Sequence, residues 1–503
     1  MSSPAHSVVQ SVDWLAIAPP TVTAAVGLAV LVADLFLPDA RKALLGWVSV
    51  GGLTVAALTL LPLLDGDRTT FCLTGHPEAC SYAADRFTLV IQFLVLGGAL
   101  LAALLSVTAL KDANRQVPEG EFWFLLLCSA AGAALLPASR DLATLIVALE
   151  VASLPAFALV GIRHGDRRSS EAALKFFLSS VTATAVSLMG ISFVYATTGT
   201  LYLTQVASRI QHVDGQFHAL AQTGVVLTLV GFAFKTAAVP FHFWVPDTYV
   251  GAPLPIAAYL SVVGKAVGFS GLILVTVVAF PSYADVWGPA LAALAALTMT
   301  IGNVGALRQQ TTRAYSAVRL LAWSSVGQAG YLLVPIAAAA YTKDAQKTIG
   351  STVAYALMYG AVNLGAFAVA ALVGRTRSLN RISDYRGLYA SNPAAALLLA
   401  FFLLCLAGLP PGIIGLFAKV TVFSAAVDAG LGWLAVVMAV NVVIALFYYL
   451  RWTAMLFRTP ETQTLKHRVP APLTAALALT GVLGVVLSGA PQLVLRFAGT
   501  GLF

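Results

Sequence analysis

Residues Leu398 to Leu409 read LLAFFLLCLAGL, an unbroken apolar run that is typical of the whole chain. Of the 503 residues, 59% are hydrophobic and 10% are charged, whereas about a quarter of an ordinary soluble domain is charged. Such a chain belongs in a lipid bilayer, where only helices and closed barrels satisfy every backbone hydrogen bond. A barrel would need segments of about ten residues with alternating polarity. The run at Leu398 does not alternate, so we predict an all-α polytopic membrane protein.

Apolar stretches of roughly 18 to 25 residues recur along the chain, and this length crosses a bilayer core of about 30 Å as a helix. The first stretch has no basic region before it, so we expect a retained helix and no cleavable signal peptide. We predict about fourteen transmembrane helices by this criterion. They lie near residues 14–37, 43–63, 87–110, 121–138, 142–162, 172–197, 222–240, 254–280, 287–307, 318–337, 349–373, 393–425, 430–450 and 471–495.

The basic residues of the predicted loops are unevenly distributed. When the loops are numbered alternately, one set holds nineteen Lys and Arg residues, from Arg41 to Arg468, and the other set holds seven. Cytoplasmic loops are enriched in Lys and Arg, so the first set is predicted to be cytoplasmic and both chain termini to face outward. The net charge of +8 is spread over these short loops, which argues against a nucleic-acid-binding module.

Two of the four cysteines flank a polar loop, and the other two lie inside apolar runs. The charge bias places the loop between Cys72 and Cys80 outside the cell, and disulfides persist in oxidising compartments. We therefore predict that Cys72 and Cys80 form an external disulfide.

Four ionisable residues fall well inside predicted helices: Glu150, Lys235, Lys265 and Lys419. A charge at this depth costs about 2.5 to 3.5 kcal/mol or more on insertion scales. Near a helix end, a snorkelling lysine or a structural ion pair explains such a residue equally well. Lys265, however, lies about eleven residues from each plausible helix end, which is roughly 16 Å of helix. The set therefore favours a functional role.

Proton transfer is the chemistry that such a set supports. Burial lowers the pKa of a lysine and a nearby carboxylate raises it again, so a Glu and Lys pair with a movable partner acts as a proton valve. The sequence has no cysteine cluster for iron–sulfur ligation and no glycine-rich nucleotide fingerprint, and its histidines are too scattered to indicate a metal site. We predict no cofactor in this chain. His242 is either a proton relay or a hydrogen-bonded structural group.

Prolines interrupt two of the predicted helices near these lysines. Pro240 follows Lys235 by five residues, and the run GLPPG from Gly408 to Gly412 precedes Lys419 by seven. Broken helices mark ion pathways in transporters that are built from inverted repeats. We predict N-terminal helices in residues 1–120, two inverted five-helix units in residues 121–282 and 283–455, and a last helix in residues 456–503. A break then falls on the fourth helix of each unit.

The segment GFAFKTAAVPFHFWVPDTYVGAPLPIAAYLSVVGKAVGF, from Gly231 to Phe269, resembles the signature of the antiporter-like subunits of respiratory complex I, which are related to Mrp-type antiporters. The form HFWVPDTYVGAP within it is closest to the branch called subunit N. The resemblance extends to LEVASLP at 149–155, SSEAALKFF at 169–177 and AGLPPGIIGLFAK at 407–419.

The resemblance implies roles for individual residues. Glu150 matches the carboxylate that pairs with Lys235, Lys265 matches a central connecting lysine, and Lys419 matches a group near the outer exit. Lys175 matches a lysine on the side where protons enter, although a positive anchor of the helix start explains it almost as well. Subunit M carries a glutamate where Lys419 stands, and subunit L has further helices, so both departures favour subunit N.

The function that the resemblance implies is outward proton translocation by a membrane-arm subunit of NADH:quinone oxidoreductase. FMN, iron–sulfur clusters, NADH and quinone are then expected in partner subunits, and subunits M and K and lipids as neighbours. Alanine- and glycine-rich helices, with arginine favoured over lysine in the loops, indicate a GC-rich bacterial genome, so we expect the bacterial inner membrane as the location. Two alternatives remain open at this point, a subunit of an Mrp-type cation/proton antiporter and a structural spacer with vestigial charges.

Overall fold

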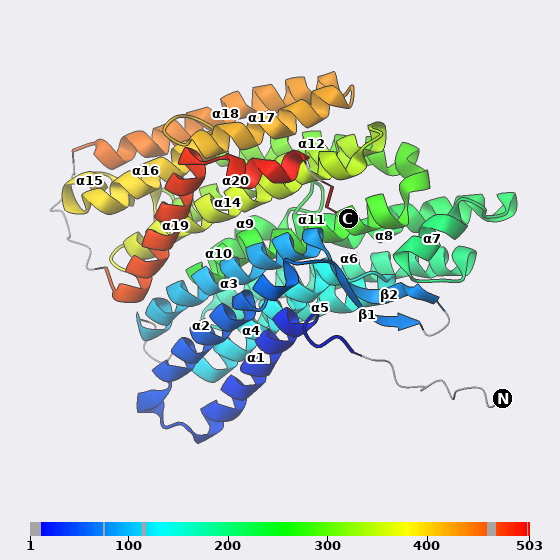
Figure 1. The fold of residues 1–503 in the computed structure, drawn as a ribbon. Coiled ribbons are helices and arrows are strands. Elements are labelled where there is room, and N and C mark those ends of the chain that lie inside the picture. Colours follow the sequence, from blue (N-terminus) through cyan, green and yellow to red (C-terminus); the bar gives the residue numbers. More distant parts are fainter. Residues whose placement is uncertain (1–11, 74–75, 113–116, 460–468, 500, 503) are drawn as a thin grey trace.

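The computed structural model describes residues 12–73, 76–112, 117–459, 469–499 and 501–502, and long helices running side by side form most of it (Figure 1). Thirteen helices of the described residues are long and apolar enough to cross a membrane. The predicted all-α polytopic fold is therefore confirmed. The remaining predicted helix, near residues 393–425, consists of two shorter helices, α16 (Pro393–Ala407) and α17 (Ile413–Asp428).

The helices follow the predicted order. The N-terminal group is α1 (Ala18–Phe36), α2 (Ala43–Leu58) and α3 (Arg86–Asp112). The next group is α4 (Glu119–Leu135), α5 (Leu142–Val160), α6 (Arg167–Thr198), α8 (His218–Thr236) with α9 (Trp244–Gly251), and the continuous segment α10 (Leu254–Tyr259), η5 (Leu260–Gly264), α11 (Lys265–Ile273) and η6 (Leu274–Ala279). The last groups are α12 (Ala284–Leu307), α13 (Ser316–Ala338), α14 (Ala345–Gly374), α16, α17 and α18 (Gly432–Phe457), followed by α19 (Ala471–Gly489) and α20 (Gln492–Leu495).

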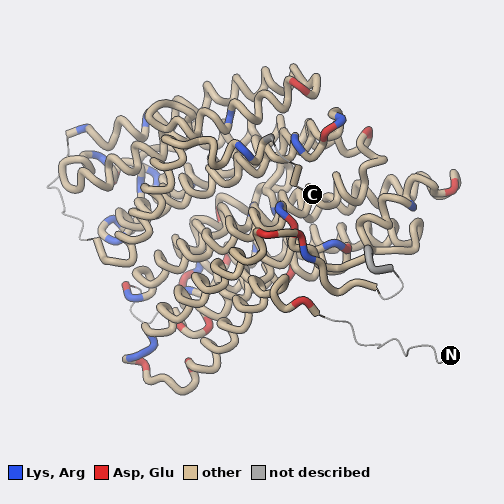
Figure 2. Tube along the Cα trace, in the orientation of Figure 1, with Lys and Arg blue, Asp and Glu red and all other residues tan. Residues whose placement is uncertain are grey.

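The centre of the molecule is formed by α13, α14 and the segment from α10 to η6, which are the most deeply buried spans. Helix α14 packs against α3, α13, α16, α17 and α19, so it connects the N-terminal helices to the later ones. In Figure 2 most charged residues lie toward helix ends and the long middle stretches are uncharged. The few charges in the middle of the bundle are therefore exceptional.

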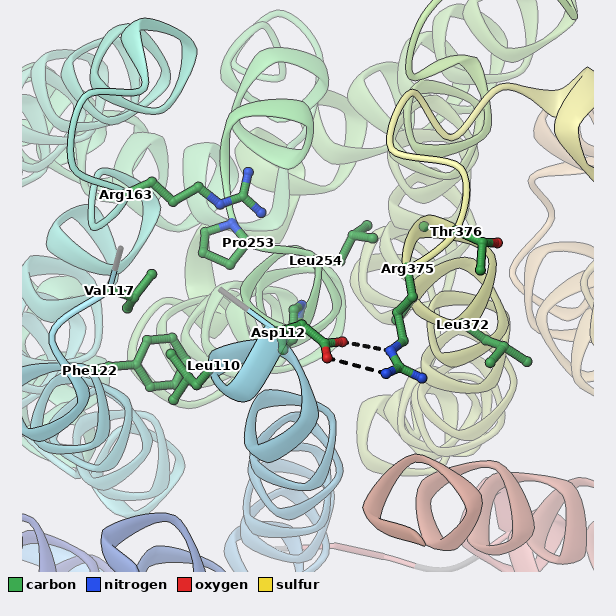
Figure 3. A pocket seen from close by; sticks show the side chains of 14 residues that line it. Leu110, Asp112, Val117, Phe122, Arg163, Pro253, Leu254, Leu372, Arg375 and Thr376 are labelled. Atoms are coloured by element: carbon green, nitrogen blue, oxygen red, sulfur yellow. Dashed lines mark hydrogen bonds and ion pairs between the residues drawn. The ribbon is translucent and has the colours of Figure 1, made fainter. Parts of the chain in front are cut away.

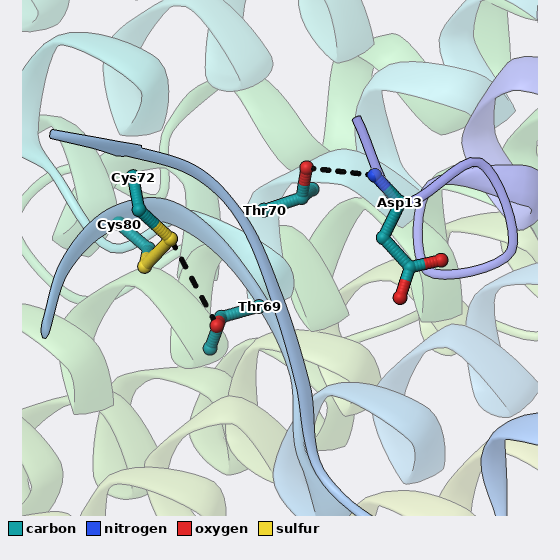
Figure 4. The surroundings of a disulfide bond; sticks show 5 residues. All are labelled: Asp13, Thr69, Thr70, Cys72 and Cys80. Atoms are coloured by element: carbon teal, nitrogen blue, oxygen red, sulfur yellow. Dashed lines mark hydrogen bonds between the residues drawn. A yellow bond between two sulfur atoms is a disulfide. The ribbon is translucent and has the colours of Figure 1, made fainter. Parts of the chain in front are cut away.

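The sequence prediction missed short elements between the spans, among them α9, α7 (Leu203–Ile210) and a hairpin. Helix α7 lies between α6 and α8, and it is too short to register as a membrane span. The segment between α2 and α3 is an antiparallel hairpin, β1 (Arg68–Leu73) and β2 (His76–Ala84), in which Cys72 faces Cys80. A disulfide joins these two cysteines (Figure 4).

Both described chain ends lie at the hairpin side of the bundle. Asp13 pairs with Arg68 at 3.1 Å, and its backbone N–H donates to the Thr70 hydroxyl. The carbonyl of Leu502 accepts a hydrogen bond from the N–H of Phe87, at the start of α3. The two described ends therefore lie at the same side of the helix bundle. Three basic residues used for the charge bias of the predicted loops, Arg115, Lys466 and Arg468, lie outside the described residues.

Candidate functional site

The two helix breaks begin with the same backbone motif. Helix α8 ends at Thr236 and α16 ends at Ala407, and the residue after each end is left-handed, with φ 67° at Ala237 and 84° at Gly408. At the first break Ala237 and Ala238 donate to the carbonyls of Phe234 and Ala233. At the second break Gly408 and Leu409 donate to the carbonyls of Cys405 and Leu404. Both ends are therefore Schellman motifs, which leave the final carbonyls of the helix for other partners.

A buried lysine binds the final carbonyls at each break. The Lys265 ammonium lies 3.4 Å from the carbonyl oxygen of Thr236. The Lys419 ammonium donates to the carbonyls of Leu406 and Ala407 at 2.8 and 2.7 Å. The C-terminal end of a helix carries a partial negative charge, so these positions favour a cation. The breaks thus provide two places in the interior where backbone carbonyls stabilise an ammonium group.

Lys235 has a different environment, built from the facing helix α5. Its ammonium donates to the Ser153 hydroxyl at 2.7 Å, and that hydroxyl donates to the carbonyl of Leu149 at 2.6 Å. The carboxylate of Glu150 forms no ion pair with Lys235 in the described structure and instead accepts a hydrogen bond of 2.6 Å from the Thr184 hydroxyl. Ser153 is three residues beyond Glu150, so both lie on one face of α5.

Ser153 and Thr184 are site residues that the sequence reasoning missed. The available signal was the helical spacing of Ser153 from Glu150 within an otherwise apolar stretch. No comparable signal pointed to Thr184, which lies on α6 and reaches Glu150 through the packing of two helices.

Aromatic rings accompany two of the lysines. The Lys235 ammonium lies 5.5 Å from the centre of the Phe176 ring, and the Lys419 ammonium lies 5.6 Å from that of Tyr331. An ammonium within about 6 Å of a ring centre gains cation–π attraction, which increases when water is excluded. Lys235, Lys265 and Lys419 are 3%, 2% and 6% exposed, so bulk solvent does not reach them.

The backbone around Lys265 is irregular. Lys265 is the first residue of α11 and follows the π-helical turn η5, and a second π-helical turn, η6, ends the segment. Isolated π-helical turns are rare and occur frequently at functional sites. Lys265 therefore lies at a widened turn near the middle of a buried span.

Lys175 and His242 lie apart from this group. Lys175 is exposed on α6 and pairs with Glu171 at 2.7 Å and Asp247 at 3.0 Å, and Arg319 approaches the same aspartate at 3.4 Å. His242 lies in the first break with its ring 5.6 Å from that of Trp323. Among the described residues, no hydrogen bond joins either side chain to Glu150 or the buried lysines.

A cavity of about 650 Å³ opens at the helix ends farthest from the hairpin (Figure 3). Asp112 and Arg375 form an ion pair of 2.6 Å there, which ties the end of α3 to the end of α14, and Arg163 extends toward Pro253. Neither Glu150 nor any of the three buried lysines lines this cavity. Within the described ranges, no group of three or more His, Cys, Asp and Glu side chains is placed to hold a metal ion.

Comparison with known proteins identifies the family. The profile of the NADH:quinone oxidoreductase/Mrp antiporter transmembrane family matches residues 139–445, which include both breaks, Glu150 and the three buried lysines. The chain belongs to this family. A relative from Streptomyces griseus subsp. griseus, named NADH-quinone oxidoreductase subunit N 2, is 73% identical, and the alignment covers 100% of this chain and 96% of the relative. The chain therefore belongs to the subunit N branch, as its motifs predict.

Solved structures agree with this assignment. A chain of respiratory complex I from Thermus thermophilus is 32% identical with a TM-score of 0.76, and the match covers 96% of this chain and 100% of that chain. A chain of the Mrp complex from Dietzia sp. DQ12-45-1b shares the fold, with 22% identity, a TM-score of 0.82 and coverage of 97% and 96%. The multi-pass helical fold is common to both.

Proposed function

We propose that this chain is a proton-translocating membrane-arm subunit of NADH:quinone oxidoreductase. The observation that carries the proposal is the placement of Lys265 and Lys419 on the carbonyl ends of two broken helices. Membership in the subunit N branch supplies the context, because relatives there carry the name of that enzyme. Electron transfer in partner subunits would supply the energy.

The proposed relay runs from Glu150 and Lys235 through Lys265 to Lys419. A buried ammonium is favoured when a carboxylate is near and disfavoured when it is far. A movement of Glu150 relative to Lys235 would therefore switch Lys235 between holding and releasing a proton. Lys265 is the next acceptor, because its ammonium contacts the carbonyl of Thr236, the residue that follows Lys235. Lys419 completes the relay at the second break.

The proposed direction is outward. The charge bias of the loops places the hairpin and both termini outside a bacterial inner membrane. Lys175 and its ion pairs with Glu171 and Asp247 would then lie at the cytoplasmic surface, where protons enter. His242 stays a candidate relay of lower rank, since it forms no hydrogen bond to a buried lysine in the described structure.

The proposed partners are the other membrane-arm subunits, in particular M and K, together with lipids. NADH, FMN, the iron–sulfur clusters and quinone would bind partner subunits, and this chain would contribute no redox centre. The predicted division into N-terminal helices, two five-helix units and a last helix is retained as part of the proposal, and the matched Schellman motifs support it.

Mass spectrometry of the gently solubilised native complex tests the proposal against the Mrp-type alternative. We expect flavin and iron–sulfur subunits to accompany this chain. Co-purification with cation/proton antiporter subunits alone would overturn the proposal. The structural-spacer alternative predicts unchanged pumping when the buried lysines are removed, and pumping measurements on point variants test it.

A further inference from the structure

A stripe of polar side chains runs along one buried face of α14. Tyr355, Tyr359 and Asn363 are spaced by four residues, so they lie one above the other on that face. Asn363 donates to the Ser261 hydroxyl at 2.6 Å, and Tyr359 donates to the Ser261 carbonyl at 3.1 Å. Ser261 is one helical turn before Lys265. One end of the stripe therefore reaches the segment that carries the central lysine.

The other end of the stripe reaches Lys419. Tyr355 donates to the side-chain oxygen of Gln328 on α13. A small cavity of about 10 Å³ is lined by Gln328, Tyr355, Tyr359 and Lys419, with apolar side chains that include Val362 completing its wall. A cavity of about 10 to 15 Å³ holds one water molecule when two to four polar groups line it. This cavity meets both conditions, so a water there would connect the tyrosines to Lys419.

The gap that this stripe spans has no direct connection. Lys265 binds the end of α8 and Lys419 binds the end of α16, and no hydrogen bond between described residues joins the two ammonium groups. The Lys265 ammonium, in contrast, contacts the carbonyl of Thr236, which is the residue next to Lys235 on α8. The step from Lys265 to Lys419 has no such shared neighbourhood in the described structure, so it needs an intermediate.

We infer that Tyr359 is the proton-relay residue between Lys265 and Lys419, acting through one water in the cavity beside Gln328 and Tyr355. The inference rests on the proposed function.

In the described structure the Tyr359 hydroxyl donates to the Ser261 carbonyl and lies 2.9 Å from the Ser325 hydroxyl oxygen. In the inferred step the Lys265 ammonium leaves the Thr236 carbonyl and gives a proton to the Tyr359 oxygen, while the O–H proton of Tyr359 turns toward the cavity and passes to the water, because a hydroxyl both donates and accepts. The water in turn gives a proton to the neutral amine of Lys419. Tyr359 and the water end neutral, and the net change is one proton moved from Lys265 to Lys419.

The Tyr359→Phe variant tests the inference, because it removes one oxygen and keeps the ring. We expect normal amounts of assembled complex and a loss of proton pumping per complex of roughly a hundredfold or more, the range for loss of a proton-transfer group. Tyr283→Phe is the matched control, since Tyr283 is also buried and its hydroxyl has no hydrogen-bond partner in the described structure. That control should pump normally.

A second variant tests the water without removing a polar group. Val362→Ile adds a methyl group at the wall of the cavity and should reduce pumping, whereas Val369→Ile, at a buried valine of the same helix that does not line the cavity, should not. Normal pumping by assembled Tyr359→Phe, while Lys265→Ala fails to pump, would overturn the inference and leave the proposed function standing. Normal pumping by both Tyr359→Phe and Lys265→Ala would overturn the proposed function itself.

Discussion

The two helix breaks are built alike but hold their lysines differently. Each begins with a Schellman motif and presents its last carbonyls to an ammonium group. At the first break the ammonium comes from Lys265 on the next span, whereas at the second it comes from Lys419 on the second half of the same broken helix. The first break also has a carboxylate nearby, Glu150, and the second has no carboxylate paired with its lysine among the described residues.

The difference indicates what the carboxylate contributes. Lys419 is 6% exposed and is held by two carbonyls and a ring, so a buried ammonium in this fold needs no carboxylate for its stabilisation. The carboxylate near Lys235 is therefore better explained as a means of changing that lysine's proton affinity. The first break would then act as the valve and the second as the exit.

The largest expected effect is a loss of assembled complex when a glycine that packs closely against a helix break is replaced. A Cβ atom at Gly268 would lie 2.4 Å from the backbone nitrogen of Thr236, and one at Gly415 would lie 1.8 Å from the carbonyl oxygen of Cys405. Gly268→Ala and Gly415→Ala should each lower the free energy of unfolding by about 3 kcal/mol or more, because the backbone must move to make room for the added methyl group. Native gels should show little assembled complex for both.

Gly97→Ala is the matched control for these two substitutions. No atom lies within 4 Å of a Cβ at Gly97, and alanine is the better helix former by about 1 kcal/mol. This variant should assemble normally. Normal assembly of Gly268→Ala or Gly415→Ala would show that the close approach at that break is dispensable.

A smaller difference in stability is expected between variants that remove Lys419 and variants that remove Lys235. Lys419→Met leaves the carbonyls of Leu406 and Ala407 without their hydrogen bonds to the lysine. Each unsatisfied carbonyl should lower the free energy of unfolding by about 1 to 3 kcal/mol. Lys235→Met removes the hydrogen bond from the ammonium to the Ser153 hydroxyl, but that hydroxyl still donates to the carbonyl of Leu149. The variant should therefore lower the free energy of unfolding by less than about 1 kcal/mol. Thermal melting of the solubilised complex should show the larger loss for Lys419→Met. The reverse order would contradict the account of how each lysine is held.

The next comparison tests coupling within the valve. Glu150→Gln removes the attraction for Lys235, but Ser153 still accepts its hydrogen bond, so the cost should be below the roughly 3 to 5 kcal/mol of a broken buried pair. Adding Lys235→Met should improve assembly relative to Glu150→Gln alone, although neither variant should pump. Effects that simply add would show that the two residues do not interact. Glu150→Asp should retain part of the activity.

The smallest effect is expected in the hairpin, outside both breaks. Thiol labelling of native, non-reduced protein should leave Cys72 and Cys80 unmodified, because they are bonded to each other. The double variant Cys72→Ser with Cys80→Ser should pump at the parent rate, since none of the hydrogen bonds and ion pairs given for the described part of the hairpin reaches Glu150 or a buried lysine. Free, reactive thiols at these positions would refute the disulfide.

Much of the fold could be predicted because lipid leaves few choices. Long apolar runs must be helices, and the two proline-containing interruptions predicted both breaks. The hairpin and α7 were missed because they lie between spans, where that constraint does not apply.

The site was predicted in part for a similar reason. Charges in apolar helices are conspicuous, so Glu150 and the three lysines could be found from the sequence. Their partners could not be found, because Thr184, Ser153 and the carbonyls of Leu406 and Ala407 are ordinary residues in a membrane helix. Only the packing of the helices brings them to the charges.

The ratio of protons pumped to NADH oxidised in vesicles carrying Lys265→Ala tests the central claim most directly. Lys347→Ala, an exposed lysine at the start of α14, is the control and should keep the parent ratio. We predict that Lys265→Ala assembles but pumps far fewer protons per NADH, because the relay loses its central acceptor. An unchanged ratio in the assembled Lys265→Ala complex would contradict the account.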